Sequence, residues 1–241
     1  MQYIRTCKPN WNKINNIANT DYIKFTNNDI CSRKLPYSFI KSYDNLPIDK
    51  YLENNNPPTR FRRFSKYAIH PFTDNIYHIY HDSCNVFEQN VKDCRGDIRR
   101  FELLERKFVK DKWLLEMLTN IAGTSIMNSQ KRVKTVNITL HQVRQLAYPN
   151  SVGAHNSPEG IHRDGADFIV SAFVLNRKNV SGGESIIYNE NKKQIYKTTL
   201  NNNNGIFQED QNLWHYVTPI QSIDNKNIGL RDIIGLDISL D

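Results

Sequence analysis

The sequence predicts a mainly β protein, a sandwich or barrel that is braced by helices on one side. Three observations support this fold class. Val136, Ile138 and Leu140 alternate with polar residues, which is the period of a half-buried strand. Several short β-like runs follow, and turn signals separate them. A single segment with helical periodicity precedes the whole series.

The N-terminal part, up to residue 58, is rich in Asn, Lys and Tyr and is interrupted repeatedly by proline. Such a composition predicts short irregular elements that cover something larger, as a lid or an edge layer does. We assign residues 1–96 to this covering, substrate-facing segment.

The segment from residue 97 to 123 has the period of an amphipathic helix. Gly123 follows the last apolar position and is a candidate C-cap. The apolar residues recur at three- and four-residue steps: Phe101, Leu104, Phe108, Leu115 and Leu118.

Residues 134–241 are expected to form the β core, and residues 1–241 a single domain. Turn signals such as Gly182-Gly183 and the polar stretch 201–205 separate the runs. After the strand that begins near Val136, the β-like runs are 168–175, 185–188, 195–200, 214–220 and 230–240.

The composition limits the classes of protein. No apolar run reaches 18 residues, and the N-terminus lacks a hydrophobic segment, so neither a membrane span nor a secretory signal is expected. The four cysteines form no CxxC pair. We therefore expect a reduced, cytoplasmic protein.

The net charge of +7 permits contact with nucleic acid but does not require it. The only dense basic cluster, from Arg60 to Lys66, has aromatic residues between its cations. This pattern fits either a base-stacking patch or a strand with cations on one face and rings on the other. The alternation favours the strand, so a nucleic-acid partner is not expected.

His162 and Asp164 are two residues apart, and in an extended segment both side chains point to the same face. His215, in a later strand-like run, is a third candidate ligand that a barrel could bring beside them. Two histidines and one carboxylate leave open positions on one side of iron(II), as binding of dioxygen and a chelating co-substrate requires. The sequence therefore predicts an iron site at these three residues.

Arg231 begins the last strand, on a face that continues with Ile233 and Gly235. An arginine at the head of such a face needs an anion, and a carboxylate suits its planar guanidinium group. If the metal is iron, this carboxylate belongs to 2-oxoglutarate. An ion pair with Asp232 or Asp224 is the alternative.

Gln142 and Arg144 continue the apolar face of the strand that contains Ile138 and Leu140. Either they enter the active site, where they would help to bind the co-substrate, or the strand has left the core. We favour the site. His141, on the opposite face, is expected to be structural.

Four motifs in order, over residues 138 to 241, resemble the Fe(II)/2-oxoglutarate dioxygenase family that contains bacterial L-isoleucine dioxygenase. They are the strand His141-Gln142-Val143-Arg144, the stretch from Pro158 to Phe168, the turn Gly182-Gly183-Glu184 and the segment from His215 to Pro219. The resemblance implies a double-stranded β-helix (jelly roll) with flanking helices. It also implies an iron triad of His162, Asp164 and His215 and a 2-oxoglutarate clamp at Arg231.

The same resemblance implies that 2-oxoglutarate and O2 are consumed, that succinate and CO2 are formed, and that an unactivated C–H bond is hydroxylated. It makes a free L-amino acid the expected substrate. Arg60-Phe61-Arg62 resembles an Arg-x-Arg element of the family, and Arg60 and Arg62 could bind a substrate carboxylate. Phe64 stands where the family pattern has Tyr, and the first 58 residues match no element of it.

Two alternatives remain open at this point. A peptide or protein hydroxylase would keep the metal and co-substrate residues but need an open groove. A catalytically inactive jelly roll that binds nucleic acid would use the basic segment from Arg60 to Lys66.

Overall fold

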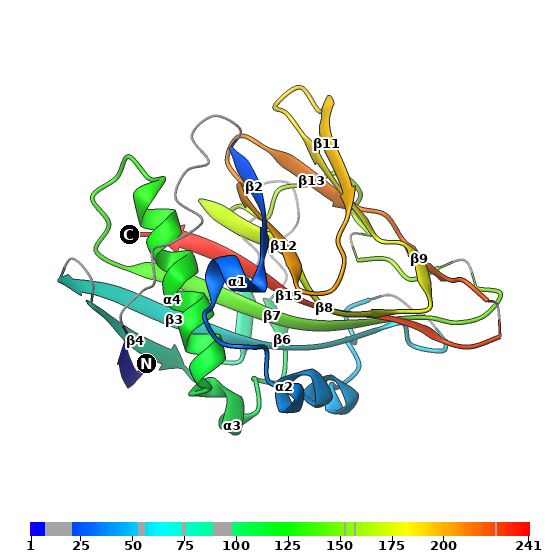
Figure 1. The fold of residues 1–241 in the computed structure, drawn as a ribbon, viewed down its shortest axis with the longest axis horizontal. Helices are drawn as coiled ribbons and strands as arrows, with labels where there is room; N and C mark the ends of the chain where they lie inside the picture. Colours follow the sequence, from blue (N-terminus) through cyan, green and yellow to red (C-terminus); the bar gives the residue numbers. More distant parts are fainter. Residues whose placement is uncertain are drawn as a thin grey trace.

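The computed structural model describes residues 1–7, 21–52, 56–73, 76–88, 98–151, 153–156, 158–224 and 226–241. Its main element is an eight-stranded sheet with the strand order β1-β4-β3-β7-β15-β8-β12-β2 (Figure 1). In this order the strands are Gln2–Cys7, Ile76–Asp82, Arg60–Thr73, Val136–Ala147, Gly229–Leu240, Phe168–Lys178, Asn204–Glu209 and Tyr22–Thr26.

Three smaller sheets complete the β structure. The first has the order β11 (Gln194–Thr199), β10 (Glu184–Tyr188) and β13 (Trp214–Val217); the others pair β14 (Ile220–Ser222) with β9 (Val180–Gly182), and β5 (Val86–Glu88) with β6 (Ile98–Arg100). The predicted fold class, mainly β with a jelly-roll core and flanking helices, is confirmed.

The centre of the large sheet is the antiparallel pair β7–β15, which is continuous from Val136↔Leu240 to Ala147↔Gly229. Alternate side chains of these strands enter two different hydrophobic cores. Ile138 and Leu236 pack with the residues of helix α4, whereas Val143 and Ile233 pack with β8, β10 and β12 inside the jelly roll. The face of β15 that carries Ile233 is therefore the face that looks into the jelly roll.

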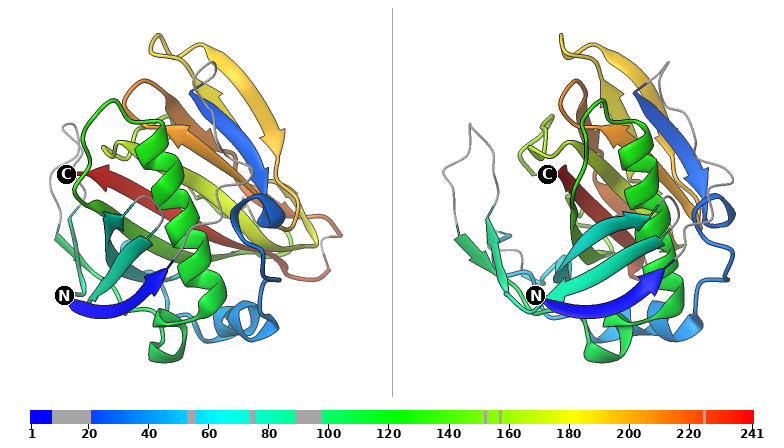
Figure 2. Two further views of the ribbon diagram at one scale, coloured as in Figure 1. Left: turned by 60° about the vertical axis from the view of Figure 1, so that its left-hand side comes forward. Right: turned by 90° about the vertical axis from the view of Figure 1, so that its left-hand side faces the viewer.

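Helix α4 (Lys112–Met127) covers the outer face of the large sheet (Figure 2). It begins where the Asp111 carboxylate accepts hydrogen bonds from the backbone N–H groups of Trp113 and Leu114, which have no partner inside the helix. The prediction of one helix over 97–123 was wrong at both ends. Residues 98–100 form strand β6, and a separate turn, α3 (Arg106–Val109), precedes α4.

The C-cap prediction at Gly123 was also wrong. Gly123 is buried inside α4, which ends at Met127 with Asn128 as its C-cap. No helix in the described part of the chain is long and apolar enough to cross a membrane.

The N-terminal segment supplies both edge strands of the large sheet as well as a cover. β1 pairs with β4 at one edge, and β2 pairs with β12 at the other. Between β2 and β3 the chain forms α1 (Asn27–Ile30), α2 (Tyr37–Lys41) and the 3-10 turn η1 (Ser42–Asn45). Residues 8–20, 53–55, 74–75 and 89–97 of the predicted covering segment lie outside the described residues.

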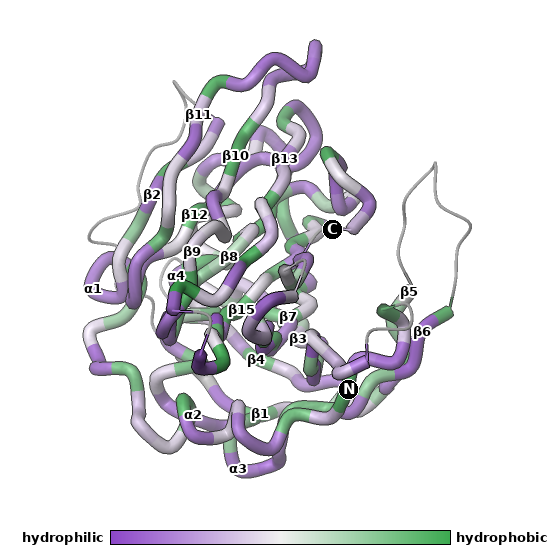
Figure 3. Tube along the Cα trace, turned by 90° about the vertical axis from the view of Figure 1, so that its right-hand side faces the viewer, coloured by the Kyte–Doolittle hydropathy of each residue, from purple (hydrophilic) through white to green (hydrophobic). Residues whose placement is uncertain are grey.

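The inner face of the large sheet is bordered on two sides. Figure 3 shows β5 and β6 on one side and β10 and β13 on the other, with β3, β7 and β15 between them. Side chains that project from the inner faces of β3, β7 and β15 thus lie between these two borders.

Candidate active site

A short antiparallel bridge brings His162 and His215 together. The backbone N–H of each residue donates to the carbonyl of the other, at 3.0 and 2.9 Å. The imidazole rings lie side by side as a consequence, with their centroids 4.2 Å apart. The structure thus brings together two residues that are far apart in the sequence.

Asp164 completes the group. One carboxylate oxygen lies 3.5 Å from Nε2 of His162 and the other 3.5 Å from Nε2 of His215. One candidate ligand atom from each of the three residues falls within 4.8 Å of the others. Three donor atoms this close, on side chains that share one opening, could hold a metal ion.

The ring of His162 is oriented for such a role. Its Nδ1 lies 2.8 Å from the carbonyl oxygen of Gly160, an acceptor, so Nδ1 carries the proton and donates it. In the neutral ring, Nε2 then has its lone pair free; this atom lies 3.0 Å from Oε1 of Glu159 and 3.5 Å from Oδ1 of Asp164. A backbone carbonyl that fixes the tautomer in this way is typical of metal-binding histidines.

Asp210 holds the loop that carries Asp164. Its carboxylate accepts hydrogen bonds from the backbone N–H groups of Asp164, Gly165 and Ala166, at 3.2, 2.7 and 3.1 Å. Burial and the neighbouring charge of Asp164 raise the pKa of Asp210 to about 7, although these three N–H groups oppose the shift. Asp210 was not predicted from the sequence, since its role is defined by contacts with backbone atoms.

The three clustered residues affect one another's pKa values. Burial lowers the pKa of His215 to about 4. Burial would also lower the pKa of His162, but hydrogen bonds to Asp164 and Glu159 outweigh it and raise this pKa to about 11. Burial would raise the pKa of Asp164, but the two histidines hold it well below its ordinary value. The group therefore presents an ionised carboxylate between a protonated His162 and a neutral His215.

A cavity of about 470 Å³ opens beside these residues. His162, Asp164 and His215 line it on the side of β13. The strands of the large sheet contribute the inward-facing residues Arg60, Arg62, His141, Val143, Ile233, Gly235 and Asp237. The volume suits a small organic molecule.

Arg60 and Arg62 both lie in the wall of this cavity. Arg60 pairs with the buried carboxylate of Asp49 at 2.8 Å and donates to the carbonyl of Asn156 at 3.2 Å. Arg63, on the other face of β3, pairs with Glu102. The segment from Arg60 to Lys66 is thus part of a strand, as the alternation predicted. The side chains of Arg60 and Arg62 line the cavity.

Arg231 lies on the same inward face of β15, beyond Ile233, and is fully buried. Its Nη1 donates to Oε1 of Gln145 at 3.2 Å, whereas Nε and Nη2 have no hydrogen-bond partner among the described residues. Burial and the neighbouring Arg177 lower the pKa of Arg231 to about 9. A buried guanidinium group with two free N–H positions fits a ligand carboxylate.

The alternative ion pairs for Arg231 are not formed. Asp232 pairs with Arg144, and Asp224 accepts hydrogen bonds from Asn179 and Asn227. The environment of Arg231 also contains two further unpaired donors, Nη1 of Arg177 and Nε2 of Gln145. This surplus of donors supports an anion as the missing partner.

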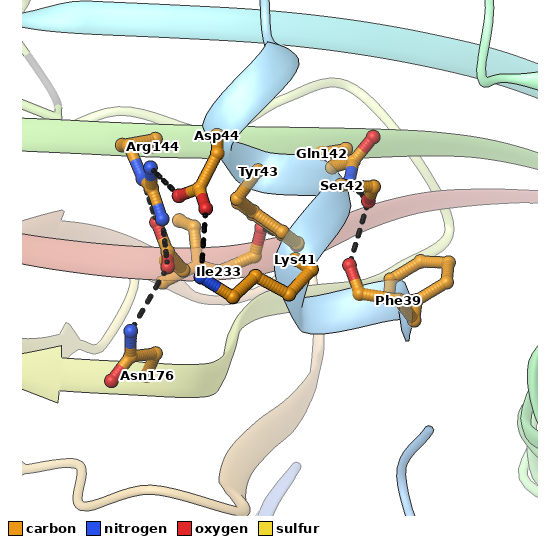
Figure 4. A network of polar contacts seen from close by, with 10 residues as sticks. Phe39, Lys41, Ser42, Tyr43, Asp44, Gln142, Arg144, Asn176 and Ile233 are labelled. Atoms are coloured by element: carbon orange, nitrogen blue, oxygen red, sulfur yellow. Dashed lines mark hydrogen bonds and ion pairs between the residues drawn. The ribbon is translucent and has the colours of Figure 1, made fainter. Parts of the chain in front are cut away.

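Gln142 and Arg144 lie on the opposite face of β7, which corrects the expectation that they enter the site. Gln142 donates to Oγ of Ser42 at 2.7 Å, and Arg144 bridges Asp232 and Asp44 (Figure 4). The apolar stripe that they continue faces α4 and η1. The expectation fails because the alternation of apolar and polar residues does not say which face of a strand is inside.

The expectation that His141 is only structural is corrected too, because this residue lines the cavity. Asp237 and Glu159 line it too and had no signal in the sequence beyond their type. Asp237 could have been found by extending the face of Arg231, Ile233 and Gly235 by one more step of two residues.

The sequence profile of the 2OG-Fe dioxygenase family matches residues 40–237. The chain belongs to this family. It is an Fe(II)/2-oxoglutarate-dependent dioxygenase, and iron(II), 2-oxoglutarate and O2 are the cofactor and co-substrates of its family. The chemistry of the site agrees, because the clustered residues are of the types that bind iron(II) and Arg231 has unpaired donors for a carboxylate.

Solved structures share the fold. A BsmA homologue from Methylobium petroleophilum PM1 is 21% identical, with a TM-score of 0.73 over 84% of this chain and 79% of that one. IDO from Bacillus thuringiensis is 19% identical, with a TM-score of 0.72 over 95% of this chain and 98% of that one. The Fe(II)/α-ketoglutarate-dependent dioxygenase TqaL is 13% identical, with a TM-score of 0.62 over 91% and 83% of the two chains. A search of curated proteins finds no match.

Proposed function

We propose that His162, Asp164 and His215 bind the iron(II) ion of this dioxygenase and that Arg231 binds the distal carboxylate of 2-oxoglutarate. The clustering of the three side chains at the mouth of a cavity carries this proposal. The unpaired N–H groups of Arg231 support the second part. When bound, the iron supplies the oxidation of a C–H bond, coupled to the decarboxylation of 2-oxoglutarate to succinate and CO2.

The protein's own residues fix the position of the reactants. Asp210 holds the loop of Asp164, and the Gly160 carbonyl holds the tautomer of His162. These contacts keep the three ligand atoms on one side and leave the other side open to the cavity.

We propose that the substrate is a small molecule of the free L-amino acid class and that residues 1–241 act as one domain. The cavity volume and its mixed charge support this substrate class. Cations at Arg60, Arg62 and Arg99 and carboxylates at Glu159 and Asp237 line it, which suits a molecule with charges of both signs. The substrate carboxylate would bind at Arg60 and Arg62.

The experiment is a screen of the iron(II)-loaded protein against the twenty L-amino acids, with succinate release as the readout. We expect one or a few of them to raise succinate formation well above the rate without a substrate. In His162→Ala this stimulation should be lost, since an incomplete ligand set does not hold the iron. If folded His162→Ala releases succinate at the wild-type rate, the ligand assignment is wrong.

A further inference from the structure

Three charged or polar side chains form a chain of hydrogen bonds along the wall of the cavity, outside the proposed ligand set. They come from neighbouring strands: Arg62 from β3, His141 from β7 and Asp237 from β15. Nη2 of Arg62 lies 2.6 Å from Nδ1 of His141, and Nε2 of His141 lies 2.8 Å from Oδ2 of Asp237. All three residues line the cavity.

The direction of these hydrogen bonds follows from the first of them. A guanidinium group has only N–H donors, so Nδ1 of His141 must be the acceptor. Burial and the charge of Arg62 lower the pKa of His141, which keeps its ring neutral. The single ring proton is therefore on Nε2, and it is donated to Asp237.

Two aromatic rings hold the guanidinium group of Arg62, with which this series of hydrogen bonds begins. The Arg62 guanidinium lies over the ring of Phe101, 4.4 Å from its centroid, and 5.3 Å from the centroid of Phe87. Cation–π contacts of this kind fix the plane of the guanidinium group. His141 and then Asp237 are oriented in turn.

Asp237 is left with a free position. Only Oδ2 accepts a side-chain hydrogen bond within the described residues, and the side chain is 25% exposed. Gly235, one step before it on the same inward face, leaves room for a small group, since a Cβ there would be in ordinary van der Waals contact with His141 and Val170 at 3.7–4.0 Å. Asp237 thus lines the cavity with one carboxylate oxygen that accepts no side-chain hydrogen bond within the described residues, next to a position without a side chain.

We propose that Asp237 binds a protonated amine of the substrate. Arg62 and His141 are positioning residues that orient the carboxylate of Asp237. This rests on the proposed function and adds the group that recognises the amine. An ammonium group is the partner that an oriented carboxylate in a partly desolvated wall favours. His141 donates its ring proton to Oδ2 of Asp237, which leaves Oδ1 for the amine.

The test compares each L-amino acid that stimulates succinate release with its 2-hydroxy acid, which has a hydroxyl group in place of the amine. Two readouts are used: the KM from succinate release, and the change in absorbance when the compound is added to the anaerobic protein with iron(II) and 2-oxoglutarate. For the wild type we expect the amino acid to bind at least about 10-fold more tightly than the hydroxy acid, since one charge-assisted contact is lost.

Asp237→Asn keeps the size of the side chain and can still accept from His141, but it removes the charge. We expect the KM for the amino acid to rise about 10-fold or more, whereas binding of the hydroxy acid and of 2-oxoglutarate stays unchanged. Asp237→Glu should recover part of the preference. Asp44→Asn, the same change on the outer side of the sheet, is the control and should keep the wild-type preference.

The outcomes separate this inference from the proposed function. If the wild type binds no 2-oxoglutarate, the proposed function fails. If 2-oxoglutarate binds but no amino acid alters the absorbance or succinate release, the amino-acid substrate of the proposed function fails together with the amine inference. If an amino acid does so and its hydroxy acid binds equally well, only the amine inference is overturned. An unchanged preference in Asp237→Asn would overturn it too. The wild-type comparison is decisive even if this variant does not fold.

Discussion

At the scale of a single residue, the unpaired donors of Arg231 indicate the chemistry of the ligand that would bind there. It is fully buried, it has one hydrogen-bond partner in Gln145, and two of its N–H positions have none. Leaving such groups unpaired costs about 1–3 kcal/mol each, or more when the group is charged. A bound carboxylate would remove this cost, which supports the role that we propose for Arg231.

The first prediction concerns this residue. Arg231→Lys keeps the charge but loses the planar pair of donors, so the KM for 2-oxoglutarate should rise about 10- to 100-fold. Affinity for iron(II) alone should not change, because Arg231 is not among the clustered ligand residues. The check is a 2-oxoglutarate titration at saturating substrate. An unaltered KM in Arg231→Lys and also in Arg231→Ala would contradict the assignment.

Arg144 gives the second prediction, which differs from what its sequence position suggested. It forms a bidentate ion pair with Asp232, whose side chain is fully buried. Arg144→Leu leaves that carboxylate without its cation, and we expect unfolding in urea to require about 3–5 kcal/mol less. The KM for 2-oxoglutarate in the folded protein should stay at the wild-type value. A selective loss of 2-oxoglutarate binding with normal stability would return Arg144 to the site.

At the scale of an element, the turn at Gly182-Gly183 connects β9 to β10 and passes beside Arg231. Both glycines have positive φ angles, 71° and 64°. A Cβ on Gly183 would lie 2.9 Å from Nη1 of Arg177 and 3.4 Å from Cδ of Arg231. The turn thus needs glycine for its backbone conformation and also for the space that the two arginines occupy.

The third prediction follows from this close approach. Gly183→Ala should displace the two guanidinium groups and raise the KM for 2-oxoglutarate several-fold, with the substrate KM less affected. Asn203→Ala is the control, since Asn203 has a similar φ of 63° in an exposed turn. It should alter stability without altering the KM. Equal KM values for 2-oxoglutarate in Gly183→Ala and wild type would show that the turn does not position Arg231.

The helix α4 shows where prediction from sequence reached its limit at this scale. The period of Leu115 and Leu118 correctly indicated a helix that packs on a sheet. The same period included Phe101, which belongs to a separate aromatic cluster with Phe64 and Phe87. Apolar spacing does not distinguish two hydrophobic clusters that follow each other in the chain, whereas Asp111 is an N-cap signal that marks the start of α4.

For the whole molecule, the fold class and the positions along the chain of several core strands could be predicted because strand alternation and turns are local signals. The grouping of His162, Asp164 and His215 was also expected, since a barrel returns distant strands to one another. The faces of β7 could not be assigned, because both are largely buried: one by α4 and the other by the jelly roll. A strand that is covered on both sides gives no polar face from which to infer its orientation.

The N-terminal segment could not be placed from sequence for a related reason. β1 and β2 form opposite edges of one sheet and pair with strands far away in the chain. Pairing of this kind depends on partners that no local pattern identifies. The N-terminal segment is therefore part of the large sheet. Its strand β3 places Arg60 and Arg62 in the wall of the cavity.

The most direct test of the central claim is the visible absorbance of the anaerobic protein with iron(II) as 2-oxoglutarate is added. The charge-transfer band of the bound co-substrate should appear in the wild type, be absent in Asp164→Ala and require about 10- to 100-fold more 2-oxoglutarate in Arg231→Lys. Circular dichroism of each variant checks that it is folded. No band in the wild type, or a band of full intensity in folded Asp164→Ala, would contradict the site described for this dioxygenase.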